Sequence, residues 1–366
     1  MRIALKELLR RPSRFLTAGG ALTLLVVLLL VLGGILDGLL NGSTGAYRAQ
    51  SASVFVFSSD SRDSLPRSVI TADQQAAISS LSGVHEATGF GVALVAAHIP
   101  GRAEAASAAV FGYEAANRAV PTPLPAGQAY VDRSLAHDGV ELGQTLTLGD
   151  ARTPVRVIGW VEDTSYSLSG GIWVEPKTWR EVLAQSFPDQ ALPPDAFQAV
   201  LVTPQEGLAP QTLGSKIAAA VPGVDALTLD QAIASLPGVT QQQSVFTAVI
   251  GVTLVVAGLV VALFFALLTL ERVGLFGVLK ALGTPSRSLA GGLTIQALLI
   301  AAGAFVVGGS LTWVLAQLIP ADVPLQLLPR RVVLTAVGLV VTALIGSAIS
   351  FRKIIRIDPA IAVGGS

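Results

Sequence analysis

The sequence has no cysteine and little charge, and these two absences exclude several classes of protein. Without cysteine there is no disulfide, no thiolate metal site, no cysteine nucleophile and no covalent C-x-x-C-H attachment of haem. Only 13% of the 366 residues are charged, which is about half of the share found in soluble domains. Basic and acidic residues balance at 24 each, so no general attraction to nucleic acid is expected.

The motifs of common catalytic sites are also missing. None of the five lysines follows a glycine, which excludes the G-x-x-x-x-G-K-[ST] loop and P-loop ATP hydrolysis by this chain alone. No G-x-S-x-G or H-E-x-x-H is present, and His85, His98 and His137 are too dispersed for a paired-histidine metal site. We therefore expect no enzyme activity, no metal site and no intrinsic cofactor. An active site assembled from dispersed carboxylates is the remaining alternative.

What the sequence does contain is long apolar runs. Phe15–Leu36 holds 22 uncharged residues, or about 33 Å of helix, enough to cross a ~30 Å hydrocarbon layer. A signal peptide is the competing interpretation, but the run is too long for its apolar region and no A-x-A-like cleavage site follows. Three more runs, Val245–Leu270, Leu289–Ile319 and Val332–Phe351, predict three further spans. The third span has five glycines that would allow close helix packing or local flexibility: Gly291, Gly292, Gly303, Gly308 and Gly309.

The distribution of lysine and arginine predicts the orientation of the spans. Basic residues gather before the first span, between the second and third spans, and after the fourth. With four spans, these three segments share one side, which we expect to be cytoplasmic. Only Arg330 and Arg331 oppose this rule. The chain is thus expected to be a multi-pass plasma-membrane protein with both termini in the cytoplasm and residues 41–240 outside.

The large segment between the first two spans is expected to be a mildly acidic, mixed α/β domain, with 11 basic and 19 acidic residues. Short runs rich in β-branched or aromatic residues predict eight strands: Val54–Phe57, Val92–Ala96, Ala108–Phe111, Ala129–Val131, Thr145–Leu148, Val155–Val161, Gly171–Val174 and Ala199–Val202. Helices are predicted at Ala72–Ser80, Pro176–Gln185, Gln211–Val221 and Leu229–Ser235. Thr71 with Gln74 forms a capping pattern, and Pro176 suits a first helical turn.

The most informative short stretch is residues 271–288, between the second and third spans. It predicts a helix that ends at Gly283, followed by Thr284 as N-cap and Pro285 in the next first turn. The apolar positions Leu275, Val278, Leu279 and Leu282 make this elbow amphipathic. It is either an ordinary interfacial loop or a coupling element that docks into another protein.

These motifs resemble a known family. Glu271-Arg272, the run Gly277-Val-Leu-Lys-Ala-Leu-Gly283 and the tail Arg356-Ile-Asp-Pro-Ala360 are similar to the FtsX/MacB-type permeases, the type VII ABC transporters. The resemblance implies a membrane α-helical fold with four transmembrane helices and a large mixed α/β extracellular domain between helices 1 and 2. It further implies a homodimer, two ABC ATPase subunits that bind ATP-Mg, and a mechanotransmission mechanism. Residues Gln128–Asp163 would be its β-rich insertion. The implied ATPase-coupling residues are Glu271, Gly277, Leu279, Lys280, Leu282 and Gly283.

Three further stretches are similar to the HrtB family of haem-exporter permeases: Ile3–Leu8, Val157–Tyr166 and the ending Ser347–Gly365. This resemblance implies haem as the substrate and Tyr166 as a candidate ligand. That family has a second tyrosine just before the second span, where this chain has Leu236. Haem requires an apolar cleft, an oxygen or nitrogen ligand and polar groups at its rim. The candidate substrate residues are Leu32, Ile35, Leu36, Asp37, Leu39, Asn41, Tyr47, Arg48 and Tyr166. For the polar ones, an interfacial or helix-end role is the alternative.

Together these observations predict the permease subunit of an ATP-driven efflux transporter of haem, in contact with membrane lipid and with no nucleic-acid partner. An FtsX-like signaller that does not transport, and instead activates an extracellular cell-wall hydrolase, is the alternative. The predicted segments are an N-terminal amphipathic helix at 1–14, spans at 15–40, 245–270, 289–319 and 332–351, the external domain at 41–240, the elbow at 271–288 and a cytoplasmic tail at 352–366.

Overall fold

The computed structural model describes residues 12–121, 124–271, 282, 285–320 and 323–355. Its residues form two compact units: a helical unit that comprises residues up to Gly38 and from Gln243 onward, and an α/β unit that comprises Leu39–Gln242. The amphipathic helix predicted at 1–14 lies almost wholly outside the described residues, as do most of the elbow and of the C-terminal tail. The two units are described separately below.

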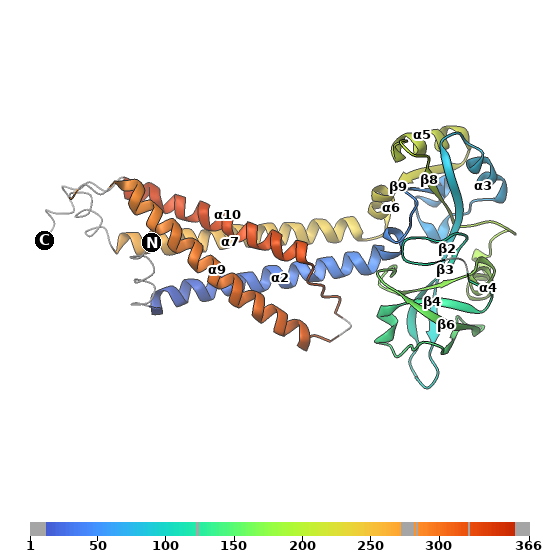
Figure 1. Ribbon diagram of the computed structural model, residues 1–366, viewed down its shortest axis with the longest axis horizontal. Helices are drawn as coiled ribbons and strands as arrows, with labels where there is room; N and C mark the ends of the chain where they lie inside the picture. The colour runs from blue at the N-terminus through green and yellow to red at the C-terminus, as the bar shows by residue number, and fades with distance from the viewer. Residues whose placement is uncertain (1–11, 122–123, 272–281, 283–284, 321–322, 356–366) are drawn as a thin grey trace. The chain divides into compact units, whose positions relative to one another are not determined.

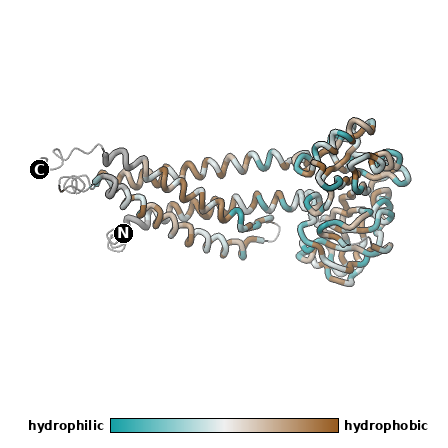
Figure 2. The backbone as a smooth tube through the Cα atoms, turned by 45° about the horizontal axis from the view of Figure 1, so that its top comes forward, coloured by the Kyte–Doolittle hydropathy of each residue, from teal (hydrophilic) through white to brown (hydrophobic). Residues whose placement is uncertain are grey.

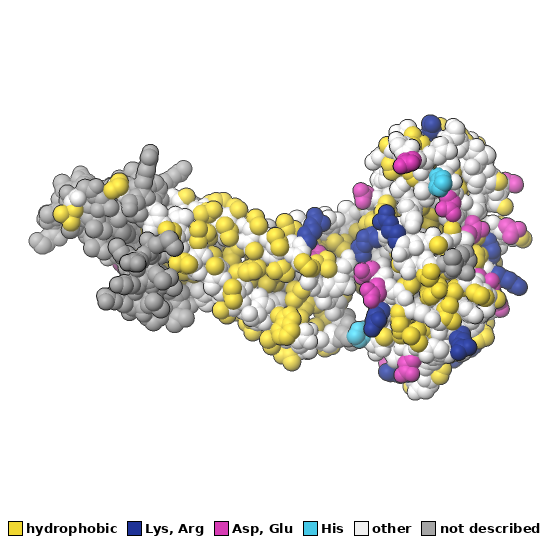
Figure 3. Space-filling view, in the orientation of Figure 1, with side chains coloured by type: hydrophobic (Ala, Val, Ile, Leu, Met, Phe, Trp, Pro, Cys, Tyr) yellow, Lys and Arg dark blue, Asp and Glu magenta, His cyan; other side chains and the backbone are white. Residues whose placement is uncertain are grey.

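Four long helices make up the helical unit: α2 (Pro12–Arg48), α7 (Val239–Leu270), α9 (Ser286–Leu318) and α10 (Pro329–Ile355). Each is long and apolar enough to cross a membrane. Hydrophobic residues run along all four (Figure 2), and apolar side chains cover most of their visible surface (Figure 3). An apolar surface of this kind is stable in lipid, because a helix satisfies its own backbone hydrogen bonds there. The predicted membrane fold is confirmed.

Small residues bring these helices together at two crossings. A Cβ atom built on Gly308 of α9 would lie 2.8 Å from Val26 Cγ1 of α2, and one on Gly346 of α10 would lie 2.9 Å from the carbonyl oxygen of Gly258 on α7. Only glycine permits so close a backbone approach. Of the five glycines noted in the third span, only Gly308 has this role, because a Cβ atom at any of the other four would meet no described atom within 4 Å.

The α/β unit is built on one nine-stranded sheet (Figure 1). Its strands are β1 (Val54–Ser58), β2 (Val84–His98), β3 (Ala106–Tyr113), β4 (Gln128–Asp132), β5 (Thr145–Leu148), β6 (Thr153–Val161), β7 (Gly170–Val174), β8 (Ala199–Pro204) and β9 (Val224–Thr228). The strand order is β3-β7-β4-β6-β5-β2-β8-β1-β9, and β3 also pairs with β2. That extra pairing closes six strands into a barrel.

Strand β2 joins the two halves of the sheet, since it pairs with β3 and β5 in the barrel and with β8 in the open part. The closed half has a core that includes Val110, Val131, Val157 and Ile172. Closure removes edge strands, which would otherwise expose unpaired backbone groups. The predicted β-rich stretch Gln128–Asp163 supplies β4, β5 and β6 of this barrel.

Four helices cover the sheet: α3 (Ala72–Ser79), α4 (Pro176–Ser186), α5 (Pro210–Ala220) and α6 (Leu229–Ser235). Helix α3 begins with the predicted capping box, in which Thr71 Oγ1 accepts from Gln74 N. Helix α4 has Pro176 in its first turn, as predicted. The eight predicted strands and four predicted helices all overlap observed elements. Strand β9 was not predicted.

Candidate functional site

Helix α2 has two different faces near its Gly33–Leu39 stretch. At about 100° per residue, Leu32, Ile35, Leu36 and Leu39 share one side of the helix, while Gly33, Gly34, Asp37 and Gly38 share the other. Leu36 is buried in the chain, and the side chains of Leu32, Ile35 and Leu39 are half-buried. These four residues are called the apolar stripe below. The second face is called the glycine face.

The glycine face is covered by the connector between α9 and α10. The backbone N–H of Gln326 donates to the Gly34 carbonyl at 3.0 Å. A Cβ atom at Gly38 would lie 1.7 Å from the carbonyl oxygen of Pro324, so no larger residue fits without moving the backbone. The connector therefore lies directly on the backbone of α2.

Asp37 is also on this face, and its carboxylate is paired. Arg331 Nε donates to Asp37 Oδ2 at 2.9 Å, and Arg331 Nη2 donates to Asp37 Oδ1 at 2.5 Å. Their side chains are 11% and 22% exposed, so the pair is largely removed from water. In the single chain, both carboxylate oxygens of Asp37 are therefore occupied by a guanidinium.

The other end of α2 lies in the α/β unit. Tyr47 is fully buried there, with its ring centroid 4.9 Å from that of Phe55 and 5.8 Å from that of Tyr166. Among the described residues, its hydroxyl has no hydrogen-bond partner. In the single chain, Tyr47 is therefore a core residue that packs against Phe55. Arg48 and Asn41 are half-buried, and Arg48 Nη1 donates to Thr44 Oγ1 at 2.7 Å.

Tyr166 lies in the loop between β6 and β7, and the last turns of α2 hold this loop. The Ala46 N–H donates to the Ser165 carbonyl at 3.0 Å, and the Leu168 N–H donates to the Gly42 carbonyl at 2.9 Å. A Cβ atom at Gly45 would lie 2.6 Å from the carbonyl oxygen of Asp163. Loop and helix thus meet backbone to backbone.

A buried carboxylate fixes the same loop from the opposite side. Asp132 Oδ2 accepts from Thr164 N at 2.7 Å and from Thr164 Oγ1 at 2.6 Å, while Asp132 Oδ1 accepts from Ser134 N. Asp163, Ser167 and Leu168 all have positive φ, between 51° and 64°. Three left-handed residues in one short loop persist only where the surroundings fix them. We call residues 163–169, held by α2 and Asp132, the clamped loop.

Tyr166 faces a cavity of about 140 Å³ in the α/β unit. Leu236, which stands where the resembled family has its second tyrosine, lines the same cavity. The fold thus brings the two positions together, although 70 positions separate them in the sequence. The remaining lining residues are Ser43, Asp63, Ser64, Leu65, Pro66, Leu94, Ser167 and Pro237.

Burial shifts the pKa values of two side chains that line this cavity, Tyr166 and Asp63. Burial raises the pKa of Tyr166 to about 12, with the neighbouring Tyr47 hydroxyl acting in the opposite direction. The phenol is therefore neutral at physiological pH. Burial, and secondly the charge of Asp225, raises the pKa of Asp63. The cavity thus offers a neutral oxygen donor and one carboxyl group among apolar side chains.

The predicted coupling residues are only partly described. Glu271 is exposed at the end of α7, and Leu282 is 77% exposed. Gly277, Leu279, Lys280 and Gly283 lie outside the described residues.

Comparisons with known proteins identify the class. Residues 247–359 match the family described as "FtsX-like permease C-terminal". A hemin transport system permease protein HrtB of Staphylococcus epidermidis is 22% identical over 367 aligned positions, which cover 100% of this chain and 99% of that one. An ABC transporter permease of Mycobacterium tuberculosis, described as uncharacterized, is 42% identical over 111 residues, covering 30% of this chain and 31% of its own.

Two solved structures are similar to the α/β unit. The first is the periplasmic region of MacB from Actinobacillus actinomycetemcomitans, with a TM-score of 0.35 and 13% identity over 50% of this chain and 92% of that one. The second is the extracellular domain of the transporter YknZ from Gram-positive bacteria, with a TM-score of 0.34 and 14% identity over 48% of this chain and 98% of that one.

The four apolar helices and the matching C-terminal region define an integral membrane protein with an FtsX-like permease domain. More particularly, the chain is similar over its full length to a hemin transport system permease, and over 30% of its length to an ABC transporter permease.

Proposed function

We propose that this chain is the permease subunit of an ATP-driven exporter of haem. The observation that carries the proposal is the cavity shared by Tyr166 and Leu236, next to the clamped loop. The full-length similarity to hemin transport permeases supports the same substrate. Tyr166 is the proposed oxygen ligand, because a phenol that loses its proton is a known axial ligand of haem iron.

The cavity is smaller than the ~300–1,000 Å³ of sites that enclose drug-sized ligands, at about 140 Å³ in the single chain. A porphyrin ring therefore needs further apolar surface. We propose that the apolar stripe of α2 provides it, since Leu32, Ile35 and Leu39 are only half-buried. The haem carboxylates would remain near water, because burial of an unpaired charge is costly. Asn41 and Arg48 remain the proposed polar contacts.

The second copy needed for a homodimer has a candidate surface on α7. Exposed apolar residues on this helix follow one another at intervals of three and four, which is the spacing of a helix–helix seam. They are Val245, Val249, Val252, Val256, Leu259, Leu263, Leu267 and Leu270. We propose that two copies pair along this seam. Two ATPase subunits bind at the elbow, which lies on the cytoplasmic side with both termini, and residues 41–240 face outward.

We propose that the clamped loop transmits movement of α2 to the cavity at Tyr166. Because α2 meets this loop through backbone hydrogen bonds and without intervening side chains, a shift or rotation of the end of α2 displaces Tyr166 directly. ATP-driven movement of α2 would thereby change the shape of the cavity and release the substrate. No part of this coupling requires chemistry by the chain itself.

The test is a haem titration of the purified permease–ATPase complex, followed by its Soret band. Tyr166→Phe removes the oxygen ligand and keeps the ring, so we expect about tenfold weaker haem binding with basal ATP hydrolysis unchanged. Tyr130→Phe is the matched control, because it removes a phenol hydroxyl from the same unit at a position that does not line the cavity. Ile35→Trp tests whether bulk at a half-buried position of the stripe also weakens binding.

Cells exposed to toxic haem provide the second readout. Loss of protection by Tyr166→Phe, with protection retained by Tyr130→Phe, supports export of haem. If the parent complex shows no Soret shift, or if all three variants bind haem and protect like the parent, the substrate is not haem or the site lies elsewhere. An FtsX-like signaller would instead bind a cell-wall hydrolase and show no haem response.

A further inference from the structure

A second hollow in the α/β unit lies where the hairpin β2–β3 and the hairpin β5–β6 approach each other. Its volume is about 230 Å³. Its polar lining consists of basic and hydroxyl side chains only: His98, Arg102, Thr145, Thr147 and Arg152. We call this hollow the basic pocket. It shares no lining residue with the cavity at Tyr166.

The basic lining of this pocket contrasts with the net acidic charge of the unit around it. Residues 41–240 carry 19 acidic and 11 basic residues, so the unit as a whole repels anions. Nevertheless, His98, Arg102 and Arg152 make no ion pair with any acidic residue in the described part of the chain. An arginine that serves only solubility in an acidic domain would be expected to find a carboxylate. Both arginines instead line a hollow.

The sheet register adds a fourth basic residue to the same face. His98 pairs with Thr147, and Thr145 pairs with Arg156. Residues directly opposite in an antiparallel pair place their side chains on the same face of the sheet. Arg156 therefore stands on the face of the sheet that carries Thr145, and it is exposed.

The backbone holds both pocket arginines in place. A Cβ atom at Gly139 would lie 2.4 Å from Arg102 Nη2, so the guanidinium of Arg102 rests on the Gly139 backbone. Arg152 has a φ of 57° in the β5–β6 turn, and its N–H donates to the Gly149 carbonyl at 3.2 Å. This left-handed conformation is uncommon for residues other than glycine, asparagine and aspartate. The side chain of Arg152 lines the basic pocket.

We propose that the basic pocket binds a phosphate group. Guanidinium groups bind phosphate with paired N–H donors, and the two threonine hydroxyls supply neutral donors from the β5 side. The donors come from the β2–β3 and β5–β6 hairpins. This arrangement suits a tetrahedral anion, which has oxygens on several sides. At about 230 Å³, the pocket admits a phosphate ester and is smaller than the ~300–1,000 Å³ of sites for whole drug-sized ligands.

The experiment is calorimetric titration of the full-length chain, purified in a maltoside detergent that contains no phosphate. Three probes are used: inorganic phosphate, glycerol 3-phosphate and the soluble diester glycerophosphoglycerol. Binding of the first two alone assigns the pocket to a free phosphate or monoester. Binding of the diester as well assigns it to a lipid headgroup or another phosphodiester. Binding of none of the three overturns the proposal.

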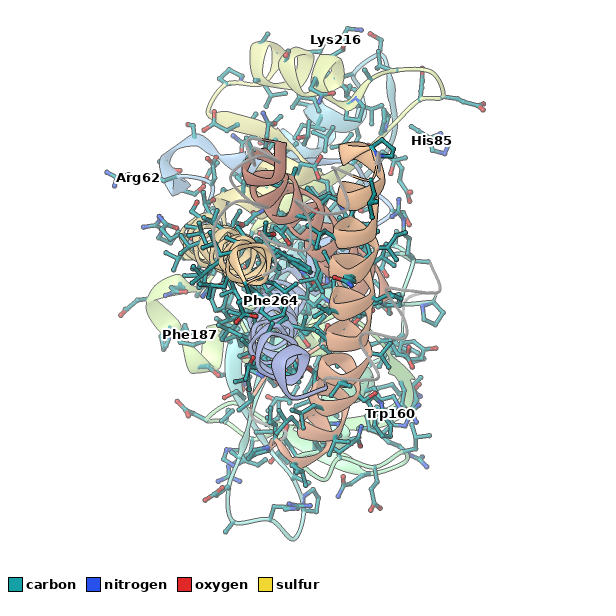
Figure 4. The ribbon with its side chains drawn as sticks, turned by 90° about the vertical axis from the view of Figure 1, so that its left-hand side faces the viewer. Arg62, His85, Trp160, Phe187, Lys216 and Phe264 are labelled. Atoms are coloured by element: carbon teal, nitrogen blue, oxygen red, sulfur yellow. The ribbon has the colours of Figure 1, made fainter. Side chains whose placement is uncertain are left out.

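The variants are Arg102→Gln and Arg152→Asn, the latter chosen because asparagine accepts a positive φ. Each is expected to weaken binding about tenfold, since a charged hydrogen-bonding partner is lost. The matched control is the double variant Lys177→Gln with Lys216→Gln. It removes two positive charges from exposed positions of the same unit, and Lys216 lies at its periphery (Figure 4). If the control weakens binding as much as the pocket variants do, attraction is general and no pocket exists.

Discussion

Asp37 of α2 and Arg331 of α10 form a two-point ion pair, with Nε–Oδ2 at 2.9 Å and Nη2–Oδ1 at 2.5 Å, between two helices of membrane-spanning length. This pair explains one of the two exceptions to the distribution of basic residues. Arg331 does not act as a free positive charge near the end of a span, because its charge is neutralised by Asp37. Ionisable groups in such helices are rare and are usually paired.

The first prediction follows from this pair. Asp37→Asn or Arg331→Gln alone leaves one buried charge without its partner, and we expect each to destabilise the chain by roughly 1–3 kcal/mol. Replacing both residues together should recover part of the loss, since no unpaired charge remains. Thermal unfolding in detergent measures the effect. The control is Arg330→Gln, because the neighbouring side chain is exposed. Equal stability of all four variants would show that the pair contributes nothing.

The second prediction concerns Gly38, which packs against the backbone of Pro324. Gly38→Ala places a methyl group 1.7 Å from a carbonyl oxygen, so the connector must move away from α2. We expect a lower unfolding temperature and faster proteolysis of the connector. Gly20→Ala is the control in the same helix, because a Cβ atom there meets no described atom within 4 Å. The helix propensity gained is about 1 kcal/mol in both variants, so a difference between them reports the clash.

The third prediction concerns the proposed coupling elbow. Leu282 is 77% exposed in the single chain, and an aspartate there would put a charge into an apolar contact with the ATPase. Leu282→Asp and Gly283→Val are expected to abolish stimulation of the ATPase while the protein remains folded and inserted. Val323→Asp, at an exposed position in the connector between α9 and α10, is the control. Normal stimulation in both elbow variants would mean that the elbow is only a loop.

Local features of the fold were predictable from the sequence. The runs that form β1 to β8 are apolar or β-branched enough to be recognised individually, and Thr71 with Gln74 marks the start of α3. Strand β9 was missed because its burial is partial and Asp225 interrupts its apolar pattern. The closed barrel was not predictable, since it depends on β2 pairing with β3, β5 and β8 at once, which no local pattern encodes.

The candidate site was predictable only in part. Tyr166 was identified from a motif, and it does line a cavity. Asp37 and Tyr47 were named as candidate substrate residues because they follow an apolar run. The sequence did not show that Asp37 pairs with Arg331 or that Tyr47 packs against Phe55. Asp132 was overlooked, since nothing in the sequence distinguishes a carboxylate that binds a loop from one that faces water.

The last prediction tests Asp132 as a positioning residue for Tyr166. Its Oδ2 accepts from both Thr164 N and Thr164 Oγ1, and an asparagine can present only one oxygen to three donors. Asp132→Asn should therefore loosen the clamped loop, at a cost of roughly 1–3 kcal/mol in the stability of the α/β unit. Tyr166 keeps its hydroxyl but loses its fixed position. We expect weaker haem binding and a loss of haem-dependent stimulation, with basal ATP hydrolysis unchanged. Asp138→Asn, an exposed acid on the same side of the chain, is the control. A purely structural role would lower stability without changing haem binding, and that result would separate the loop from the substrate site.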